Sequence, residues 1–325
     1  MAMKSLKVLA VAALFAVAAG AHAQTYPTKP VSMIVPFAAG GPTDTVARTL
    51  AAAMQKSLGQ TVIVENVGGA GGTIGAERVA RATPDGYTVL LHHIGMSTAP
   101  ALYRNLRFKP MEDFVPIGLV ADVPMTMIAR GNFPATNFKE FLAYVKANKD
   151  KLSYANAGLG SASHLCGLLF MSRIETDLTT VPYKGTAPAM NDLLGGQVDF
   201  MCDQTTNTTG QIKGGKVKAY AVTSASRVPS LPELPTIAEQ GIPGFEVVVW
   251  HGVYAPKGTP KAVQDKLVAA LQDALKDPVV KQRFNDLGTD PVAQARATPD
   301  ALANQLKSEI AKWGPVIQKA GQYAD

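Results

Sequence analysis

Short apolar runs alternate with stretches of helical periodicity along most of the chain. Residues 31–37 form a near-continuous apolar run closed by Pro36, which is typical of a strand buried on both faces of a parallel sheet. A helix is predicted after the Gly40-Gly41 loop, because apolar side chains then recur at helical spacing until Gly59. The next strand is predicted at 61–66, and a Gly-rich loop at 68–75 leads through a short helix to a strand at 87–92.

The same alternation continues through the middle of the chain. It predicts strands within 116–130 and at 152–156, 178–182, 199–202 and 217–222, helices at 138–148, 161–173 and 187–194, and a helical tail from residue 261. This order predicts an α/β fold with a parallel or mixed sheet covered on both faces. At 325 residues the chain exceeds the usual size of a single core, so we expect two lobes. The segments 115–130 and 247–254 are the candidates for strands that cross between the lobes and form a hinge.

The first two dozen residues have the pattern of a secretory signal peptide. Lys4 and Lys7 precede an apolar stretch at 8–19, and Ala21-His22-Ala23 is a typical cleavage site before Gln24. The stretch is shorter than the roughly 20 apolar residues that a membrane-spanning helix needs. We therefore expect residues 1–23 to be removed and the mature protein to reside in a periplasm.

Charge and cysteine content narrow the possible partners. The formal net charge of +6 is spread along the chain without a basic run, so no nucleic-acid partner is expected. No metal-type spacing of Cys and His occurs, and neither a metal nor a cofactor is predicted. Cys166 and Cys202 fall in a predicted helix and strand, where two buried free thiols are expected; a disulfide, which an oxidising compartment permits, is the alternative.

The Gly40-Gly41 turn before a helix is the first candidate binding feature. The first N–H groups of a helix have no partner within the helix and carry its positive dipole end, so they can bind a carboxylate. By the residues alone, such a turn can equally be purely structural, with Asp44 as an ordinary acid of the first helical turn. A second Gly-rich loop at 158–160 precedes another predicted helix, with Ser161 or Ser163 as its N-cap.

Several motifs in a fixed order carry a resemblance to a known family. The segment 26–48, YPTKPVSMIVPFAAGGPTDTVAR, is followed by VEN at 64–66, GAGG at 69–72, PDGY at 84–87, GSASHL at 160–165, VPYKG at 181–185, LGGQVD at 194–199 and PTIAE at 235–239. In these segments the chain closely resembles the Bug receptors, the extracytoplasmic solute-binding (TctC-like) proteins of tripartite tricarboxylate transporters.

The resemblance implies a type II periplasmic binding protein, with two α/β lobes that two crossing strands join in the manner of a Venus flytrap. The expected lobes are 24–121 with 251–325, and 122–250. A small organic carboxylate would bind between them and pass to the membrane permease subunits, with the receptor a monomer and without catalytic residues. The carboxylate would be held by the loop Phe37, Ala38, Ala39 and Gly40, opposite the loop that carries Gly160, Ser161, Ser163 and His164.

Further candidates follow predicted strand ends, where loops enter the cleft of such a fold. Thr43 and Asp44 start the first helix, and His93 ends a strand, although a structural histidine is an equal alternative. The remaining candidates are Tyr183, Lys184 and Asp203. For Lys184, an exposed position on the protein surface is the alternative to a place in the binding site. Asp203 would suit a ligand hydroxyl or amine better than a carboxylate.

Alternatives to a transport receptor remain at this point. Ser161 or Ser163 near His164 resembles a nucleophile with its base, so a periplasmic serine hydrolase of small esters or amides is one alternative. A carboxylate sensor for a two-component system is another. Phe37, His93 and Tyr183 could flank an aromatic ring, so the sequence leaves both aliphatic and aromatic acids open.

Overall fold

Strands and helices alternate along the described part of the chain, which in the computed structural model is residues 26–321, 323 and 324. The predicted signal peptide lies outside these residues. The strands are β1 (Val31–Val35), β2 (Val62–Asn66), β3 (Thr88–His93), β4 (Phe114–Arg130), β5 (Ser153–Asn156), β6 (Thr179–Pro182), β7 (Phe200–Gln204), β8 (Val217–Val222) and β9 (Val248–Pro256). The α-helices are α2 (Pro42–Leu58), α3 (Thr73–Ala80), α4 (Gly95–Leu102), α5 (Phe138–Ala147), α6 (Ala162–Ile174), α7 (Thr186–Leu194), α8 (Thr205–Lys213), α9 (Lys261–Lys276), α10 (Pro278–Asp286) and α11 (Pro299–Ala320), with short 3-10 turns η1 (Ala70–Gly72) and η2 (Gln294–Arg296).

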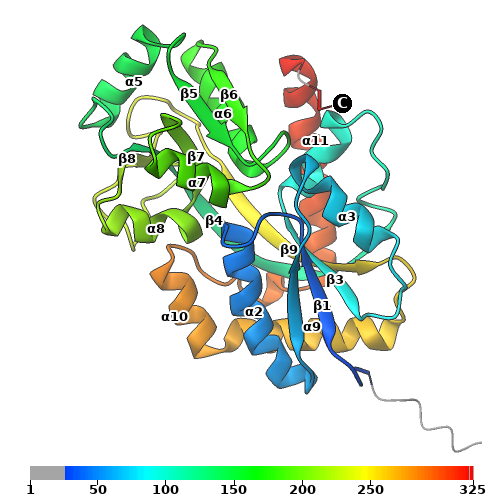
Figure 1. Cartoon of the computed structure of the whole chain (residues 1–325). Helices are drawn as coiled ribbons and strands as arrows, with labels where there is room; N and C mark the ends of the chain where they lie inside the picture. The colour runs from blue at the N-terminus through cyan, green and yellow to red at the C-terminus, as the bar shows by residue number, and fades with distance from the viewer. Residues whose placement is uncertain (1–25, 322, 325) are drawn as a thin grey trace, which may run out of the picture.

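One sheet runs through both lobes of the molecule. Its strand order is β2-β1-β3-β9-β4-β7-β5-β6, with β8 paired to β4. Strands β1, β2 and β3 are parallel in the first lobe, and β5, β6 and β7 are parallel in the second. Figure 1 shows the second lobe in green at the upper left and the first lobe in blue, cyan, orange and red below it and to its right, with β4 and β9 running between them. The structure confirms the predicted α/β fold with two lobes.

The two crossing strands are the two that the sequence predicted. β4 pairs with β9 from Phe114 opposite Pro256 to Pro124 opposite Val248, and the rest of β4 pairs with β7 and β8. A strand that belongs to both halves of the sheet is a natural hinge. The residue boundaries of the lobes given above stay a prediction.

Side chains of the crossing strands point alternately to two faces, as the pleat of a strand requires. On one face, His251 lies opposite Ala121 and contacts Thr43 at the start of α2. On the other face, Trp250 lies opposite Asp122, and both line a groove on the outside of the hinge. The hinge therefore has an inner face toward the site described below and an outer face away from it.

The expectation of free thiols is wrong, because Cys166 of α6 and Cys202 of β7 form a disulfide with their Cα atoms 6.2 Å apart. Both side chains are fully buried where α6 packs on β7. The bridge fastens two elements that end at the cleft, since α6 begins beside Ser161 and β7 ends at Gln204. Among the described residues, no helix has both the length and the apolar character required to span a membrane.

Candidate functional site

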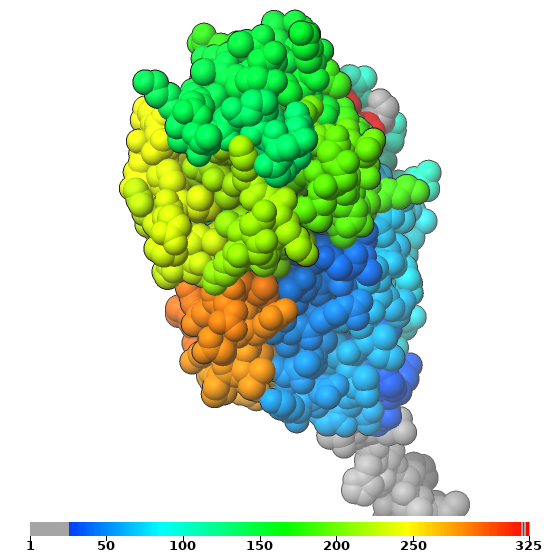
Figure 2. Space-filling view, turned by 60° about the vertical axis from the view of Figure 1, so that its left-hand side comes forward, coloured from blue at the N-terminus to red at the C-terminus, as the bar shows by residue number. Residues whose placement is uncertain are grey.

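A narrow cleft lies where the two lobes meet. Its cavity has a volume of about 10 Å³ and is lined by residues of both lobes: Phe37, Gly41, Pro42, Thr43 and His93 from the first, and Ala157, Ser161, Ala162, Ser163, Thr186, Asp203 and Gln204 from the second. Figure 2 shows the first lobe, in blue and orange, in contact with the green and yellow second lobe. The cleft is therefore a largely buried space whose walls are formed by side chains and helix starts of both lobes.

Helix N-termini from both lobes point into this cleft. α2 begins at Pro42 in the first lobe, and α6 and α7 begin at Ala162 and Thr186 in the second. Their first N–H groups lack carbonyl partners within their own helices and carry partial positive charge. Among the described residues that line the cleft, none is a lysine or arginine. An anion bound here would be held by backbone dipoles and hydroxyl groups.

Asp44 shapes the first loop from behind. Its carboxylate accepts hydrogen bonds from the Gly40 N–H at 2.9 Å, from Arg48 Nε at 2.9 Å and from Asn66 Nδ2 at 3.0 Å. Although burial acts to raise its pKa, these bonds hold the pKa of Asp44 below its usual value. Asp44 is thus fully engaged within the first lobe and fixes the turn at the start of α2.

The predicted anchor loop lies partly in the cleft. Phe37 lines the cleft, whereas Ala39 and Gly40 are exposed and outside its lining. The Ala38 N–H donates to the Lys184 carbonyl of the second lobe at 3.3 Å. The N–H groups of Ala38 and Gly40 are therefore bonded to the chain itself, and the adjoining first turn of α2 is what faces the cleft.

The facing loop presents two serine hydroxyls. Ser161 is the N-cap of α6 and accepts the His164 N–H at 3.3 Å; its Oγ lies 3.1 Å from that of Ser163, which accepts the Ala157 N–H at 2.8 Å. Gly160 and His164 lie just behind, with His164 Nδ1 accepting the Gly160 N–H at 3.1 Å. These bonds hold the start of α6 in place and engage the groups that the hydrolase hypothesis would need.

Three buried histidines, His92, His93 and His251, lie together in the first lobe, and His93 lines the cleft. The ring of His93 stacks on Phe37 with centroids 4.5 Å apart, and its Nδ1 accepts the Gly95 N–H at 2.9 Å. Burial lowers the pKa of His92 to about 3 and that of His251 to about 4, and it lowers the pKa of His93 well below its usual value. All three are neutral at physiological pH and add no positive charge.

Asp203 is the acid of the cleft. It lies fully buried near the end of β7 and accepts hydrogen bonds from the Gln204 N–H at 2.8 Å and from Asn207 Nδ2 at 2.5 Å. Burial raises the pKa of Asp203 to about 7 in spite of these bonds. The Thr186 side chain approaches Asp203 and acts to lower its pKa, and Gln204 Oε1 is buried without a hydrogen-bond partner. Buried polar atoms without a partner are uncommon in folded proteins.

Tyr183 and Lys184 do not line the cleft. The Tyr183 hydroxyl donates to Asp192 at 2.6 Å, and its ring packs against a small apolar cluster of the second lobe. The Lys184 side chain is exposed, and only its carbonyl takes part in the contact with Ala38. Sequence reasoning also missed Gln204 and His251. Gln204 is the second residue after a predicted strand end, whereas His251 lies inside a crossing strand and carries no motif.

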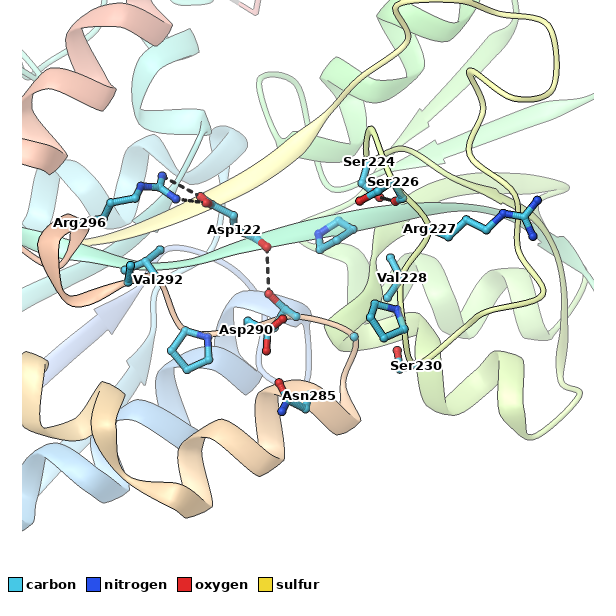
Figure 3. Close-up of a pocket in the computed structure, with 16 residues that line it drawn as sticks. Asp122, Ser224, Ser226, Arg227, Val228, Ser230, Asn285, Asp290, Val292 and Arg296 are labelled. Atoms are coloured by element: carbon cyan, nitrogen blue, oxygen red, sulfur yellow. Dashed lines mark hydrogen bonds and ion pairs between the residues drawn. The ribbon is translucent and has the colours of Figure 1, made fainter.

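A larger hollow of about 580 Å³ lies on the outer face of the hinge (Figure 3). There Asp122 of β4 forms an ion pair with Arg296, and its carbonyl accepts the Thr289 hydroxyl at 3.0 Å. Ser224 and Ser226 lie across the groove. No helix N-terminus of the second lobe opens into this groove among the residues that line it, so the inner cleft is the better candidate for binding an anion.

Two α/β lobes, two crossing strands and helix starts converging on an interlobe cleft define a solute-binding protein that closes around its ligand. The family model "Tripartite tricarboxylate transporter family receptor" (TctC) matches residues 46–322, and the chain belongs to this family. Its members are periplasmic solute-binding receptors and not enzymes, so the hydrolase hypothesis is wrong.

Solved structures of this family superpose on the chain over most of its length. The periplasmic binding protein BugD is 60% identical with a TM-score of 0.90, covering 92% of this chain and 99% of BugD. MatC from Rhodopseudomonas palustris with bound malate is 43% identical with a TM-score of 0.87, covering 90% and 100%. A further R. palustris protein with adipate is 34% identical with a TM-score of 0.86, covering 91% and 98%.

Proposed function

We propose that this receptor captures a small organic carboxylate between its lobes in the periplasm, as a monomer, and delivers it to the permease of a tripartite tricarboxylate transporter. The observation that carries the proposal is the convergence of the α2, α6 and α7 N-termini on a cleft without a cationic side chain. Malate and adipate in two related structures are both carboxylates.

Closure around the ligand follows from the position of these groups. A carboxylate bound to the start of α2 and to the start of α6 contacts both lobes, and a ligand that contacts both lobes favours the arrangement in which they meet. The closed lobes also bond directly, since Thr98 Oγ1 donates to the Gly160 carbonyl at 3.1 Å and the Tyr103 hydroxyl donates to the Leu159 carbonyl at 2.9 Å. The permease would recognise this closed form.

The arrangement of the rings favours an aliphatic acid over an aromatic one. One face of Phe37 is covered by His93, and Tyr183 is bonded to Asp192 away from the cleft lining. The aromatic side chains that could have flanked a ligand ring thus pack against the protein. We expect a short-chain aliphatic acid to bind best.

Thermal unfolding of residues 24–325 in the presence of C4 to C6 dicarboxylates, benzoate and nicotinate tests the binding proposal. A ligand at 100 times its dissociation constant stabilises the folded state by about 2.7 kcal/mol. Failure of every acid to raise the melting temperature would contradict the proposal. Mass spectrometry of the secreted protein should find Gln24 as the first residue, and uptake by proteoliposomes that contain the permease should require the loaded receptor.

A further inference from the structure

The cleft has two chemically different ends. The starts of α2 and α6 present N–H groups and hydroxyls, which suit the oxygens of a carboxylate. The end of β7 instead presents hydrogen-bond acceptors: the Asp203 carboxyl group and Gln204 Oε1. A ligand with carboxylates alone would satisfy the first end and leave the second end without donors.

Asp203 is held firmly in this orientation. The Gln204 N–H bonds to Oδ1, Asn207 Nδ2 bonds to Oδ2, and the Thr186 side chain also approaches the carboxyl group, so one of its four lone-pair directions stays open. β7 is fixed on both sides, by its pairing with β4 and β5 and by the disulfide at Cys202, one residue before Asp203. The carboxyl group is therefore a rigid part of the wall and cannot turn out to solvent.

The neighbours of Asp203 do not neutralise it. No lysine or arginine lines the described cleft, and the nearby His93 is kept neutral by its burial. Above pH 7, where Asp203 is mostly ionised, a second carboxylate placed against this wall would meet an acceptor of its own kind with no cation between them, which is unfavourable in a buried site. A hydroxyl or ammonium group at the same place would donate to Asp203 and to the unpartnered Gln204 Oε1.

Resting on the proposed function, we propose that Asp203 and Gln204 make this receptor selective for small carboxylic acids that also carry a hydroxyl or an ammonium group. The carboxylate end of the ligand would lie at the starts of α2 and α6, and the donor group would lie against the end of β7. Thr186, whose hydroxyl can both donate and accept, lies beside this second subsite.

Succinate, malate and aspartate test the proposal, because they share a four-carbon dicarboxylate and differ in carrying no substituent, a hydroxyl or an ammonium group. Calorimetric titration of the mature receptor at about pH 8.5, where Asp203 is ionised, should give an affinity for malate, aspartate or both that exceeds that for succinate by about tenfold or more, as expected for a hydrogen bond to a charged group. Equal affinities for all three acids would overturn the proposal.

Variants assign the selectivity to the residues. Asp203→Asn keeps the shape of the side chain and removes its charge, so it should weaken aspartate, strengthen succinate and bring their affinities to within about threefold. Gln204→Leu removes the second acceptor and should also reduce the preference without changing Asp203. Asp150→Asn, at an exposed position of the second lobe, is the matched control and should bind all three acids as the wild type does.

The possible failures can be told apart. Circular dichroism and melting temperature show whether each variant is folded, and Gln204→Leu provides an independent measurement if Asp203→Asn is not. Undiminished preference in both folded variants would overturn the role of these residues. If the wild-type receptor bound neither these three acids nor any other acid of the panel above, the proposed function itself would fail and this inference with it.

Discussion

The imidazole Nε2 of His251 and the hydroxyl of Thr43 lie 3.3 Å apart, which connects a crossing strand to the first turn of the helix that faces the cleft. His251 Nδ1 lies 3.1 Å from the Val249 carbonyl and donates to it, since a carbonyl can only accept. Nε2 of the neutral ring is then an acceptor, so the Thr43 hydroxyl donates to it. The hinge strand thereby sets the direction in which Thr43 presents its remaining lone pairs to the cleft.

Removing this hydroxyl should weaken ligand binding. Thr43→Val keeps the shape of the side chain and is expected to lower affinity about three- to tenfold, the effect of one lost hydrogen bond. It also leaves the buried His251 Nε2 without its donor, which should lower the free energy of unfolding by about 1–3 kcal/mol. Calorimetric titration and urea unfolding measure the two effects.

The controls for Thr43 use the same helix. Thr43→Ser retains the hydroxyl and should bind nearly as the wild type does. Thr49→Val removes a hydroxyl that bonds only to the Thr45 carbonyl, two turns along α2, and should leave affinity unchanged. Equal losses in Thr43→Val and Thr49→Val would argue against a specific role for Thr43.

A single methyl group at Gly71 should keep the lobes apart. A Cβ on Gly71 would lie 1.9 Å from the Leu159 carbonyl oxygen of the other lobe. We expect Gly71→Ala to lower ligand affinity more than about tenfold and to increase the radius of gyration of the ligand-saturated protein in small-angle scattering, because closure is obstructed.

Gly196 provides the matched control for that variant. Both glycines have left-handed backbone angles, with φ at 60° for Gly71 and 72° for Gly196, but a Cβ on Gly196 would meet no atom within 4 Å. Both substitutions to alanine carry a similar backbone penalty of roughly 1–2 kcal/mol. Only Gly71→Ala should affect binding, and a similar loss in Gly196→Ala would indicate general destabilisation instead.

The disulfide should contribute substantially to stability. Cys166 and Cys202 are 36 residues apart, and closing a loop of that length in the unfolded chain corresponds to roughly 3–4 kcal/mol. The double variant Cys166→Ala/Cys202→Ala should therefore unfold at lower denaturant concentration by about that free energy. The wild type in reductant should approach the variant, and an unchanged unfolding midpoint in both would contradict a structural role.

The buried histidines should make the protein sensitive to acid. The pKa of His92 is about 3 and that of His251 about 4 in the folded state, against about 6.5 in the unfolded state. Their neutral forms therefore contribute fully to the free energy of unfolding above pH 6.5, and this contribution is lost as the pH falls from 6.5 toward the folded-state pKa values. Between pH 7 and pH 5 each costs up to about 2 kcal/mol. Asp203 acts in the opposite direction, since its raised pKa of about 7 adds stability as the pH falls, and it offsets about one histidine.

Urea unfolding at pH 7 and pH 5 measures this dependence. His92→Asn is the informative variant, because an Asn side chain can still accept the His93 N–H that His92 Nδ1 accepts at 2.8 Å. Its free energy of unfolding should fall less between the two pH values than that of the wild type. The same fall in both proteins would assign the acid sensitivity to other groups.

Apolar pattern alone was sufficient for most of the fold. The buried runs that became β1, β4 and β9 are continuous in the sequence, and the starts of α2 and α6 are marked by glycines and a serine cap. α8 was missed because its sequence, TTNTTGQIK, has no apolar periodicity. It is held instead by threonine hydroxyls, of which Thr205 donates to the Gly288 carbonyl at 3.0 Å and Thr209 to the Leu287 carbonyl at 3.2 Å.

The site could be located from the sequence more easily than its side chains could be oriented. Strand ends marked the positions of His93 and Asp203, which line the cleft, and of Tyr183, which does not. The difference for Tyr183 is a hydrogen bond to Asp192 nine residues later, a contact that neither spacing nor composition indicates. The disulfide was missed for the same reason, because it depends on which face of α6 packs against β7.

Several hydrogen bonds between the lobes join groups of the protein directly, among them those of Thr98 with Gly160, Tyr103 with Leu159, and Ala38 with Lys184. These bonds form whenever the lobes meet, whether or not a solute lies between them. A permease that recognises only the shape of the closed receptor would therefore also bind receptors that hold no solute, and this binding would transport nothing. Efficient transport would then require the permease to recognise the bound solute as well as the closed receptor.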